Sequence, residues 1–285
     1  MRHIQFKKLY IPQKGKPMNV IVFASGSGGN LQASIDLSLM RPDLLKVGLV
    51  VTDRLGIFAI DIAHKYQIPV IAIDFEKKCG LWNENKKNSE KILRYQQCAI
   101  QYHNDILKRI RKIEEKNTIC FDLAVLSYHR WIHGDLYTYF HERMINQHAG
   151  DLNIVNDRNV RRYVGINPVL YALKAGEKMT RTTTFLVRDG HDTGEILCQG
   201  PWVDYTGSCP ITIQKSYEHE LIQKRESDWP SLQFALKHIA QGDFGISKKH
   251  IHIDGCKVIS FKGEPTGYAG VHLEKSTYKL TPYYE

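Results

Sequence analysis

From Met18 onward, the chain alternates short, uninterrupted apolar runs with amphipathic segments. The first run, from Asn19 to Ala24, is rich in β-branched residues. A glycine-rich loop from Ser25 to Asn30 follows it, and then a stretch of helical character from Leu31 to Ile35. This order predicts a strand, a loop and a helix in series.

The same alternation continues through the first half of the chain. The elements expected after the first helix are a strand over 47–52, a helix over 56–66, a strand over 69–73, a long basic helix between 76 and 116, and a strand over 122–127. Continuous apolar runs are typical of parallel strands that are buried on both faces. The pattern therefore predicts a Rossmann-like α/β fold with a mostly parallel sheet and helices on both faces.

The second half has a different pattern. It predicts a helix over 168–175, β-prone runs over 182–187 and 196–203, a long helix ending near 242, and a hairpin formed by 250–253 and 257–261. No repeat or low-complexity linker separates the halves, so we expect one domain over 18–285 with a C-terminal β extension. Residues 1–17 are expected to be an N-terminal appendage, because the fold pattern starts at Met18.

Composition narrows the class of protein. The 285 residues are 42% hydrophobic, which is enough for a buried core. No apolar run approaches the roughly 18 residues of a membrane helix, and the first 17 residues lack the apolar core of a signal peptide. We therefore expect a cytoplasmic protein without a membrane partner. The six cysteines form no C-x-x-C pair, which predicts reduced thiols and no zinc site.

The formal net charge of +9 is concentrated in one segment. Between Glu76 and Lys116 there are eleven Lys or Arg residues and six Asp or Glu residues. Apolar residues three or four positions apart in this segment indicate an amphipathic helix with a solvated basic face. A basic nucleic-acid-binding protein is the alternative, but no basic patch with interleaved aromatic residues is present, so we expect no nucleic-acid partner.

The glycine-rich loop has two interpretations. Backbone N–H groups at a helix N-terminus bind phosphate, whereas a plain tight turn needs glycines for geometry alone. Dinucleotide binding is a further alternative, with Asp53 holding a ribose, although the loop lacks the third glycine of that fingerprint. The lysine of a Walker loop is also missing.

Polar residues that suit proton transfer lie further along the chain. Asn146 and His148 are two positions apart, so on an extended strand they face the same side. An amide can stabilise an oxyanion and an imidazole can transfer protons, but a hydrogen-bonded loop histidine is the simpler alternative. Asp192 is either part of a turn or a carboxylate that orients His148. His129 and His133 have helical spacing but no evident third metal ligand.

Six segments together resemble, in matching order, the phosphoribosylglycinamide formyltransferase family of purine biosynthesis. In chain order they are Ser25-Gly-Ser-Gly-Gly-Asn-Leu-Gln-Ala33, Val51-Thr-Asp-Arg54, Leu126 to Ile132, Asn146 with His148, Asp192-Thr-Gly194, and Pro265-Thr-Gly-Tyr-Ala269. The resemblance covers nearly the whole chain from Met18. It implies a folate-dependent formyltransferase.

The resemblance also implies roles for individual residues. Asn146, His148 and Asp192 correspond to the catalytic residues of the family. The substrate phosphate would be bound by Gly26, Ser27, Gly28, Gly29 and Asn30. The folate would be bound by Arg130, Ile132, Arg188, Asp189, Gly190 and His191. The implied substrates are small molecules, 10-formyltetrahydrofolate and glycinamide ribonucleotide, with no metal, on a monomer or homodimer.

The departures from the family pattern cluster on the side of the acceptor amine. Gly29 replaces a loop serine, and Phe185 replaces a loop histidine. The family has an acidic residue for the substrate ribose, but here Lys224 and Arg225 stand nearest that position, with Glu226 beside them. A longer polar loop follows Ala149-Gly-Asp-Leu-Asn153, and Arg162-Tyr-Val-Gly165 replaces Lys-Tyr-Pro-Gly. Another phosphorylated or sugar amine is therefore the alternative acceptor. A nicotinamide-dependent oxidoreductase is the alternative from another class.

Overall fold

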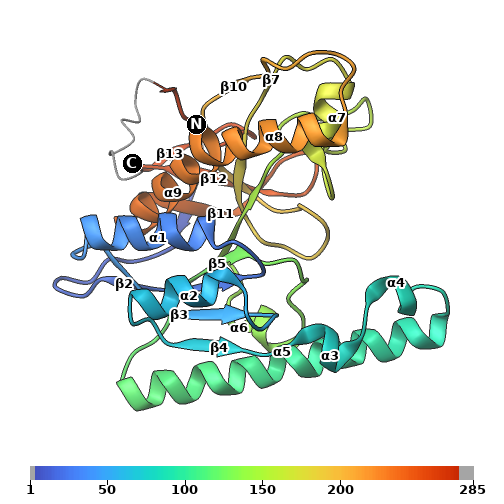
Figure 1. The fold of residues 1–285 in the computed structure, drawn as a ribbon. Helices are drawn as coiled ribbons and strands as arrows, with labels where there is room; N and C mark the ends of the chain where they lie inside the picture. Colours follow the sequence, from blue (N-terminus) through green and yellow to red (C-terminus); the bar gives the residue numbers. More distant parts are fainter. Residues whose placement is uncertain (1–3, 276–285) are drawn as a thin grey trace. The chain divides into compact units, whose positions relative to one another are not determined.

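The computed structural model describes residues 4–275 (Figure 1). In this range the chain folds into two compact units. Residues 18–144 form the first unit, and residues 4–17 together with 145–275 form the second. The domain boundaries expected from the sequence, at residues 17 and 18, stay a prediction.

The first unit contains four parallel strands in the order β5-β2-β3-β4. Their bounds are β2 (Met18–Ala24), β3 (Leu45–Thr52), β4 (Val70–Ala72) and β5 (Leu123–Ser127). Every residue of β2 except Asn19 is buried. Burial on both faces explains why these strands appear in the sequence as continuous apolar runs.

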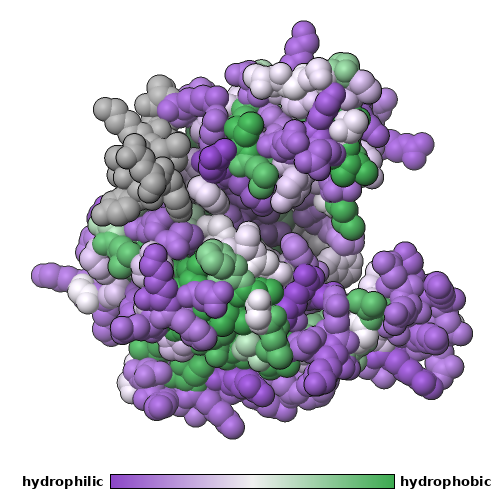
Figure 2. Space-filling model, viewed as in Figure 1, coloured by the Kyte–Doolittle hydropathy of each residue, from purple (hydrophilic) through white to green (hydrophobic). Residues whose placement is uncertain are grey.

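The helices of the first unit cover these strands. Both α1 (Gly29–Met40) and α2 (Phe58–Lys65) contact β3. The long helix α5 (Ser89–Asn117) contacts α6 (Gly134–Tyr139) and buries an apolar face that includes Ile106 and Ile110. Its opposite face is solvated, and Figure 2 shows a largely hydrophilic surface around its N-terminal end, at the right of the view.

The single helix predicted between 76 and 116 is wrong in its extent. The structure has α3 (Phe75–Cys79), α4 (Trp82–Asn85) and then α5. The side chain of Asp74 caps α3, and the side chain of Asn88 accepts hydrogen bonds from the first backbone N–H groups of α5. These capping side chains start new helices where the apolar periodicity alone suggested one.

The expectation of six reduced cysteines is also wrong. Cys79 at the end of α3 forms a disulfide with Cys98 on α5. The two residues are 19 positions apart in sequence, but the packing of α3 on α5 brings their Cα atoms to 5.5 Å. Cysteine spacing does not reveal this pair, because the contact arises from tertiary packing.

The second unit has a sheet in which β6 (Met144–His148), β8 (Thr183–Leu186) and β9 (Ile196–Gln199) are antiparallel neighbours. The short β14 (Val271–His272) pairs with β9 in parallel. The β-prone run predicted over 196–203 divides into two strands. Its second part, β10 (Val203–Asp204), pairs with β7 (Met179–Thr180) instead.

The rest of the second unit is helical and then β-structured. Its helices are α7 (Pro168–Lys174), α8 (Ile213–Gln223) and α9 (Trp229–Ala240), and the π-helical turn η1 (Lys224–Asp228) joins the last two. A second sheet has the order β1-β11-β12-β13, formed by Phe6–Lys8, Phe244–Ile251, Lys257–Phe261 and Glu264–Pro265. The predicted hairpin is present, but its first strand covers 244–251 and not 250–253. Residues of the expected N-terminal appendage form its neighbouring strand β1.

The predicted fold class is confirmed. The chain has a Rossmann-like α/β fold with a mostly parallel central sheet and a C-terminal β extension. Across residues 4–275, none of the helices combines the length and the apolar character needed to cross a membrane.

Candidate active site

The predicted phosphate loop connects β2 to α1 in the first unit. Ser25 is buried, and its hydroxyl accepts a hydrogen bond from the His129 backbone N–H at 2.9 Å. Gly28 caps α1 with a φ of +78°, and a Cβ at this position would lie 3.0 Å from the Cα of Ala59. The first turn of α1 contains no acidic residue. The backbone N–H groups at the start of α1 and the helix dipole therefore suit an anion.

Arg130, expected at the folate, is part of an ion-pair cluster in the first unit. Its Nε donates to Oδ2 of Asp53 at 2.8 Å, and its Nη2 donates to Glu76 at 2.6 Å. The guanidinium also lies 4.7 Å from the ring centre of Phe75. Asp53 is fully buried and paired with Arg130. It is therefore not presented to a ribose, as the dinucleotide alternative requires. Ile132, also expected at the folate, is buried.

Asn146 and His148 lie on β6 in the second unit, opposite Phe185 and Thr183 of β8. The carboxamide of Asn146 is half-buried and has no hydrogen-bond partner within residues 4–275. The His148 ring lies between two acceptors. Its Nε2 is 2.6 Å from the Tyr163 carbonyl oxygen, and its Nδ1 is 3.4 Å from Oδ1 of Asp192. Because a carbonyl oxygen only accepts, Nε2 donates its hydrogen to Tyr163, whereas Nδ1 lies at ion-pair distance from the Asp192 carboxylate.

Asp192 occupies the turn between β8 and β9, with a φ of +48°. Its second oxygen, Oδ2, accepts a hydrogen bond from the Gly165 backbone N–H at 2.6 Å. The carboxylate is thus held between a main-chain donor and the His148 ring. Residues beside Asp192 that were predicted to bind folate lie in the same turn. Asp189, Gly190 and His191 are exposed, whereas Arg188 forms a two-point ion pair with Glu195.

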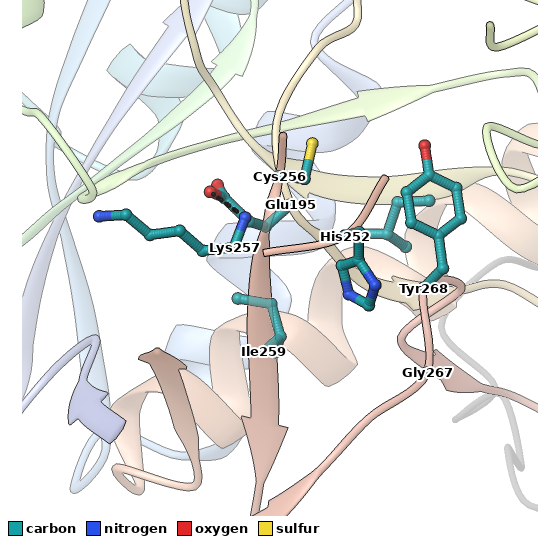
Figure 3. Close-up of a pocket in the computed structure, with 8 residues that line it drawn as sticks. Glu195, His252, Cys256, Lys257, Ile259, Gly267 and Tyr268 are labelled. Atoms are coloured by element: carbon teal, nitrogen blue, oxygen red, sulfur yellow. Dashed lines mark hydrogen bonds between the residues drawn. The ribbon is translucent and has the colours of Figure 1, made fainter. Parts of the chain in front are cut away.

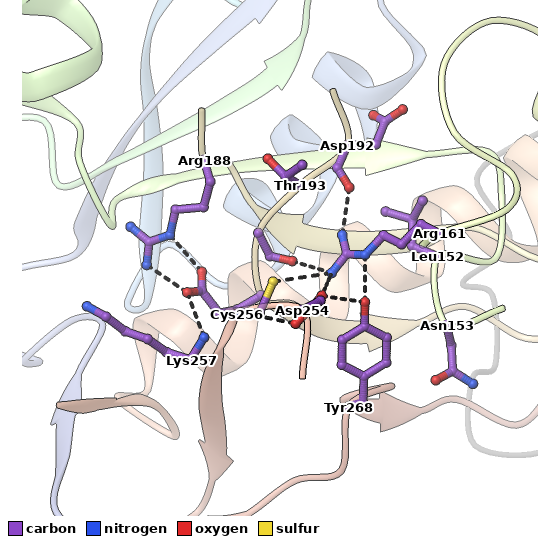
Figure 4. A network of polar contacts seen from close by, with 12 residues as sticks. Leu152, Asn153, Arg161, Arg188, Asp192, Thr193, Asp254, Cys256, Lys257 and Tyr268 are labelled. Atoms are coloured by element: carbon purple, nitrogen blue, oxygen red, sulfur yellow. Dashed lines mark hydrogen bonds and ion pairs between the residues drawn. The ribbon is translucent and has the colours of Figure 1, made fainter. Parts of the chain in front are cut away.

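The structure reveals one residue of this region that sequence reasoning missed. Arg161 is buried, and it donates to the carbonyl oxygens of Asp192 and Gly194, each at 2.6 Å (Figure 4). It also donates to the hydroxyl of Tyr268 at 2.8 Å. Arg161 belongs to the polar loop that departs from the family pattern, and no local signal distinguished it from its exposed neighbours.

A small pocket lies in the second unit beside this network (Figure 3). The space between its lining residues is about 180 Å³ even when the open solvent at its mouth is included. Eight residues line it: Glu195, Ile196, His252, Cys256, Lys257, Ile259, Gly267 and Tyr268. This volume is well below the roughly 300–1,000 Å³ of pockets for drug-sized ligands. None of the predicted catalytic residues lines the pocket, so we do not assign the folate to it.

The structure thus divides the predicted site residues between the two units. The loop residues 26–30, Arg130 and Ile132 belong to the first unit, and the catalytic residues and the turn 188–191 belong to the second. In the described part of the chain, no group of three or more His, Cys, Asp or Glu residues is arranged to hold a metal ion. The pair His129 and His133 therefore gains no third ligand there.

The chain is similar in sequence and in fold to known formyltransferases. The chain is 22% identical over 236 residues to the phosphoribosylglycinamide formyltransferase of Haemophilus influenzae, which covers 83% of this chain and 93% of the relative. Among solved structures, it resembles a phosphoribosylglycinamide formyltransferase from Coxiella burnetii. The TM-score is 0.61 and the identity 20%, with 90% and 99% of the two chains covered.

A formyltetrahydrofolate deformylase from Pseudomonas putida has the same fold. Its TM-score is 0.55 and its identity 17%, over 81% of this chain and 68% of the deformylase. The formyl transferase family model matches residues 18–219, which is most of the chain and includes the glycine loop, the Asn146 strand and the Asp192 turn. The chain therefore belongs to the formyl transferase family.

Proposed function

We propose that the protein transfers the formyl group of 10-formyltetrahydrofolate to the amine of glycinamide ribonucleotide. The observation that supports this most is the setting of His148, whose two ring nitrogens face the Tyr163 carbonyl and the Asp192 carboxylate. Membership of the formyl transferase family supports formyl transfer as the reaction. Glycinamide ribonucleotide, as acceptor, is supported by the names of the similar enzymes.

In the proposed mechanism, the acceptor amine attacks the formyl carbon, and a tetrahedral oxyanion forms. A new C–N bond to the amine is made, the bond to N10 of the folate breaks, and the proton lost by the amine goes to N10. Asn146 donates a hydrogen bond to the oxyanion, and His148 with Asp192 moves the proton. Of the two His148 contacts, the one to Asp192 is longer, at 3.4 Å. Nδ1 is therefore the nitrogen whose hydrogen can be shared with the oxyanion.

The acceptor side combines retained and altered features. The loop before α1 keeps its backbone donors for a phosphate although Gly29 lacks a hydroxyl. Lys224 stands nearest the position at which the family has its ribose-binding acid, and its Nζ lies 3.8 Å from Oδ2 of Asp228. The turn η1 therefore still carries a carboxylate near this position. These features support glycinamide ribonucleotide as the first acceptor to test, and another phosphorylated or sugar amine as the second.

Turnover of the purified protein with both substrates tests the proposal. We expect tetrahydrofolate release that depends on 10-formyltetrahydrofolate and on glycinamide ribonucleotide. His148→Ala should lower kcat by about a hundred- to a thousand-fold, because it removes an oxyanion donor and the proton carrier. His64→Ala, which removes an exposed histidine of α2, is the matched control and should retain normal turnover.

Other outcomes would redirect the assignment. Tetrahydrofolate release without any amine would indicate hydrolysis, the reaction that the deformylase name describes. Folate binding without transfer to this amine would leave the reaction class in place and require a screen of other amines. Oxidation of NADH or NADPH, seen as a loss of absorbance, would instead favour the oxidoreductase alternative.

The half-buried carboxamide of Asn146 gives a second kinetic prediction. Asn146→Ala should lower kcat by about a hundred- to a thousand-fold while the fold is retained, because one oxyanion donor is lost. Steady-state kinetics and far-UV circular dichroism measure the two quantities. Near-normal kcat in a folded Asn146→Ala protein would remove this residue from the mechanism.

A further inference from the structure

The guanidinium of Arg161 connects three segments that are far apart in sequence. Its two Nη atoms donate to the carbonyl oxygens of Asp192 and Gly194, and its Nε donates to the hydroxyl of Tyr268. Tyr268 in turn donates to Oδ2 of Asp254 at 2.6 Å. Figure 4 shows the guanidinium at the centre of this network. We name the set of Arg161, Asp254 and Tyr268 the arginine clamp.

Within the clamp, Arg161 contacts the backbone of the Asp192 turn at two points. The two carbonyl oxygens that accept from Arg161 flank Thr193, so the guanidinium bridges the backbone of the turn. A planar guanidinium fits two acceptors at once, whereas an ammonium acts as a single point of charge. The Asp192 backbone is also in the left-handed region, with a φ of +48°. Such a conformation persists only when its surroundings hold it.

The guanidinium of Arg161 is buried and paired with a carboxylate, so its position is fixed. The side chain of Arg161 is 7% exposed, and its charge lies 3.6 Å from Oδ2 of Asp254. Burial, together with the hydrogen bond to Asp254, raises the pKa of Tyr268 to about 12, although Arg161 opposes the shift. The Tyr268 hydroxyl therefore keeps its hydrogen, and with it the bond to Asp254, through the neutral pH range.

The loop that supplies Arg161 is ordered by its own hydrogen bonds. Val155 and Arg161 form an isolated antiparallel bridge, and the Asn156 side chain accepts from the backbone N–H groups of Arg158 and Val160. This is the longer polar loop that distinguishes the chain from its family. The loop therefore brings a buried cation to the turn that holds Asp192.

We propose that Arg161 is a positioning residue that fixes the carboxylate of Asp192 against His148. Arg161 does not touch the His148 ring itself; it acts on the backbone of residues 192–194, while the Asp192 carboxylate meets His148 Nδ1 at 3.4 Å. The kinetic part of this inference rests on the proposed formyl transfer. The structural part, the geometry between Asp192 and His148, does not.

Nitrogen-15 NMR of the His148 imidazole tests the structural part without any substrate. Asp192→Asn provides the reference spectrum of a ring without its carboxylate. In Arg161→Met, we expect the His148 signals to move from the wild-type position toward this reference. Arg158→Met is the matched control, since Arg158 is exposed in the same loop, and its spectrum should stay at the wild-type position.

Kinetics test the functional part. We expect Arg161→Lys and Arg161→Met to lower kcat by about ten- to a hundred-fold, the size of effect that a displacement of about 1 Å produces. KM for both substrates should change by less than about three-fold. Tyr268→Phe keeps the guanidinium but removes one of its partners, so it should lower kcat less than either Arg161 variant.

The NMR and the kinetic measurements together distinguish failure of this inference from failure of the proposed function. If the wild-type protein transfers no formyl group, the NMR comparison decides alone. Wild-type His148 signals in a folded Arg161→Met protein would overturn the inference, and so would wild-type kcat in both Arg161 variants. If Arg161→Met does not fold, the same measurements on Arg161→Lys and Tyr268→Phe decide the question.

Discussion

The glycine loop of the first unit and the Asp192 turn of the second are built in different ways. The loop offers backbone groups of consecutive residues, and its shape follows from Gly28 at the start of α1. The turn depends on side chains from elsewhere, since Arg161 and Tyr268 are 107 positions apart. A site made from local backbone can be recognised in a sequence. A site held by distant side chains becomes visible only in the fold.

The largest predicted effect on stability concerns Gly194 in the Asp192 turn. A Cβ at this position would lie 2.0 Å from the Leu186 carbonyl oxygen, and the residue has a φ of +116°. Gly194→Ala should therefore lower the free energy of unfolding by at least about 3 kcal/mol. Chemical denaturation measures this difference.

Gly190→Ala in the same turn is the matched comparison. Gly190 has a similar φ of +108°, but its Cβ would meet only the side chain of Thr193, at 3.1 Å. The loss should be about 1 kcal/mol, from backbone strain alone. Equal losses of stability in Gly194→Ala and Gly190→Ala would show that the close approach of Gly194 to the Leu186 carbonyl does not matter for the stability of the turn.

A smaller effect is predicted for the glycine loop. A Cβ on Gly28 would lie 2.8 Å from the terminal carbon of Ile62, which can move, and 3.0 Å from the backbone of Ala59, which cannot move as easily. Gly28→Ala should lower the free energy of unfolding by about 1–3 kcal/mol and raise KM for a phosphorylated amine. Gly26→Ala meets no atom within 4 Å and should change stability by less than about 0.5 kcal/mol. Equal stability of Gly28→Ala and Gly26→Ala would contradict the prediction that close packing around Gly28 shapes the loop.

The same contrast explains what could be predicted from the sequence. The strands of the first unit and the glycine loop follow from local patterns of apolar residues and glycines. The extent of the helix after residue 76 was overestimated, because one helix was expected across Gly80, which ends α3, and across the capping residue Asn88, which starts α5. The disulfide between Cys79 and Cys98 depends on how two helices pack. Local sequence contains no information on that packing.

The candidate catalytic residues illustrate a third case. The spacing of Asn146 and His148 predicted a shared direction, but it left open whether His148 had a role at all. Their assignment came from the resemblance to a family, and the structure adds the contact of His148 with Asp192. Arg161 had no such support, because its loop differs from the family pattern and its burial results from the fold of the second unit.

The two units also differ in how they bury histidine. His103 on α5 of the first unit is fully buried, its Nδ1 donates to the Ala99 carbonyl, and its Nε2 has no partner within residues 4–275. Burial, with a smaller contribution from the neighbouring His133, lowers the pKa of His103 to about 3, although the hydrogen bond to Ala99 opposes the shift. In the second unit, burial also lowers the pKa of His238, but Asp243 accepts its Nδ1 hydrogen at 2.6 Å and opposes the shift.

This difference predicts an acid-sensitive first unit. Between the unfolded pKa of 6.5 and the folded pKa of about 3, the unfolded chain binds a proton at His103 that the folded chain does not. Stability should therefore fall as the pH falls through this window, with a slope of up to about 1.4 kcal/mol per pH unit from this residue. His103→Phe fills similar space without titrating, so it should flatten the slope measured by denaturation between pH 7 and pH 4. His238→Phe should flatten it less, because Asp243 already favours the charged form of His238. An unchanged slope in His103→Phe would show that acid sensitivity arises elsewhere in the chain.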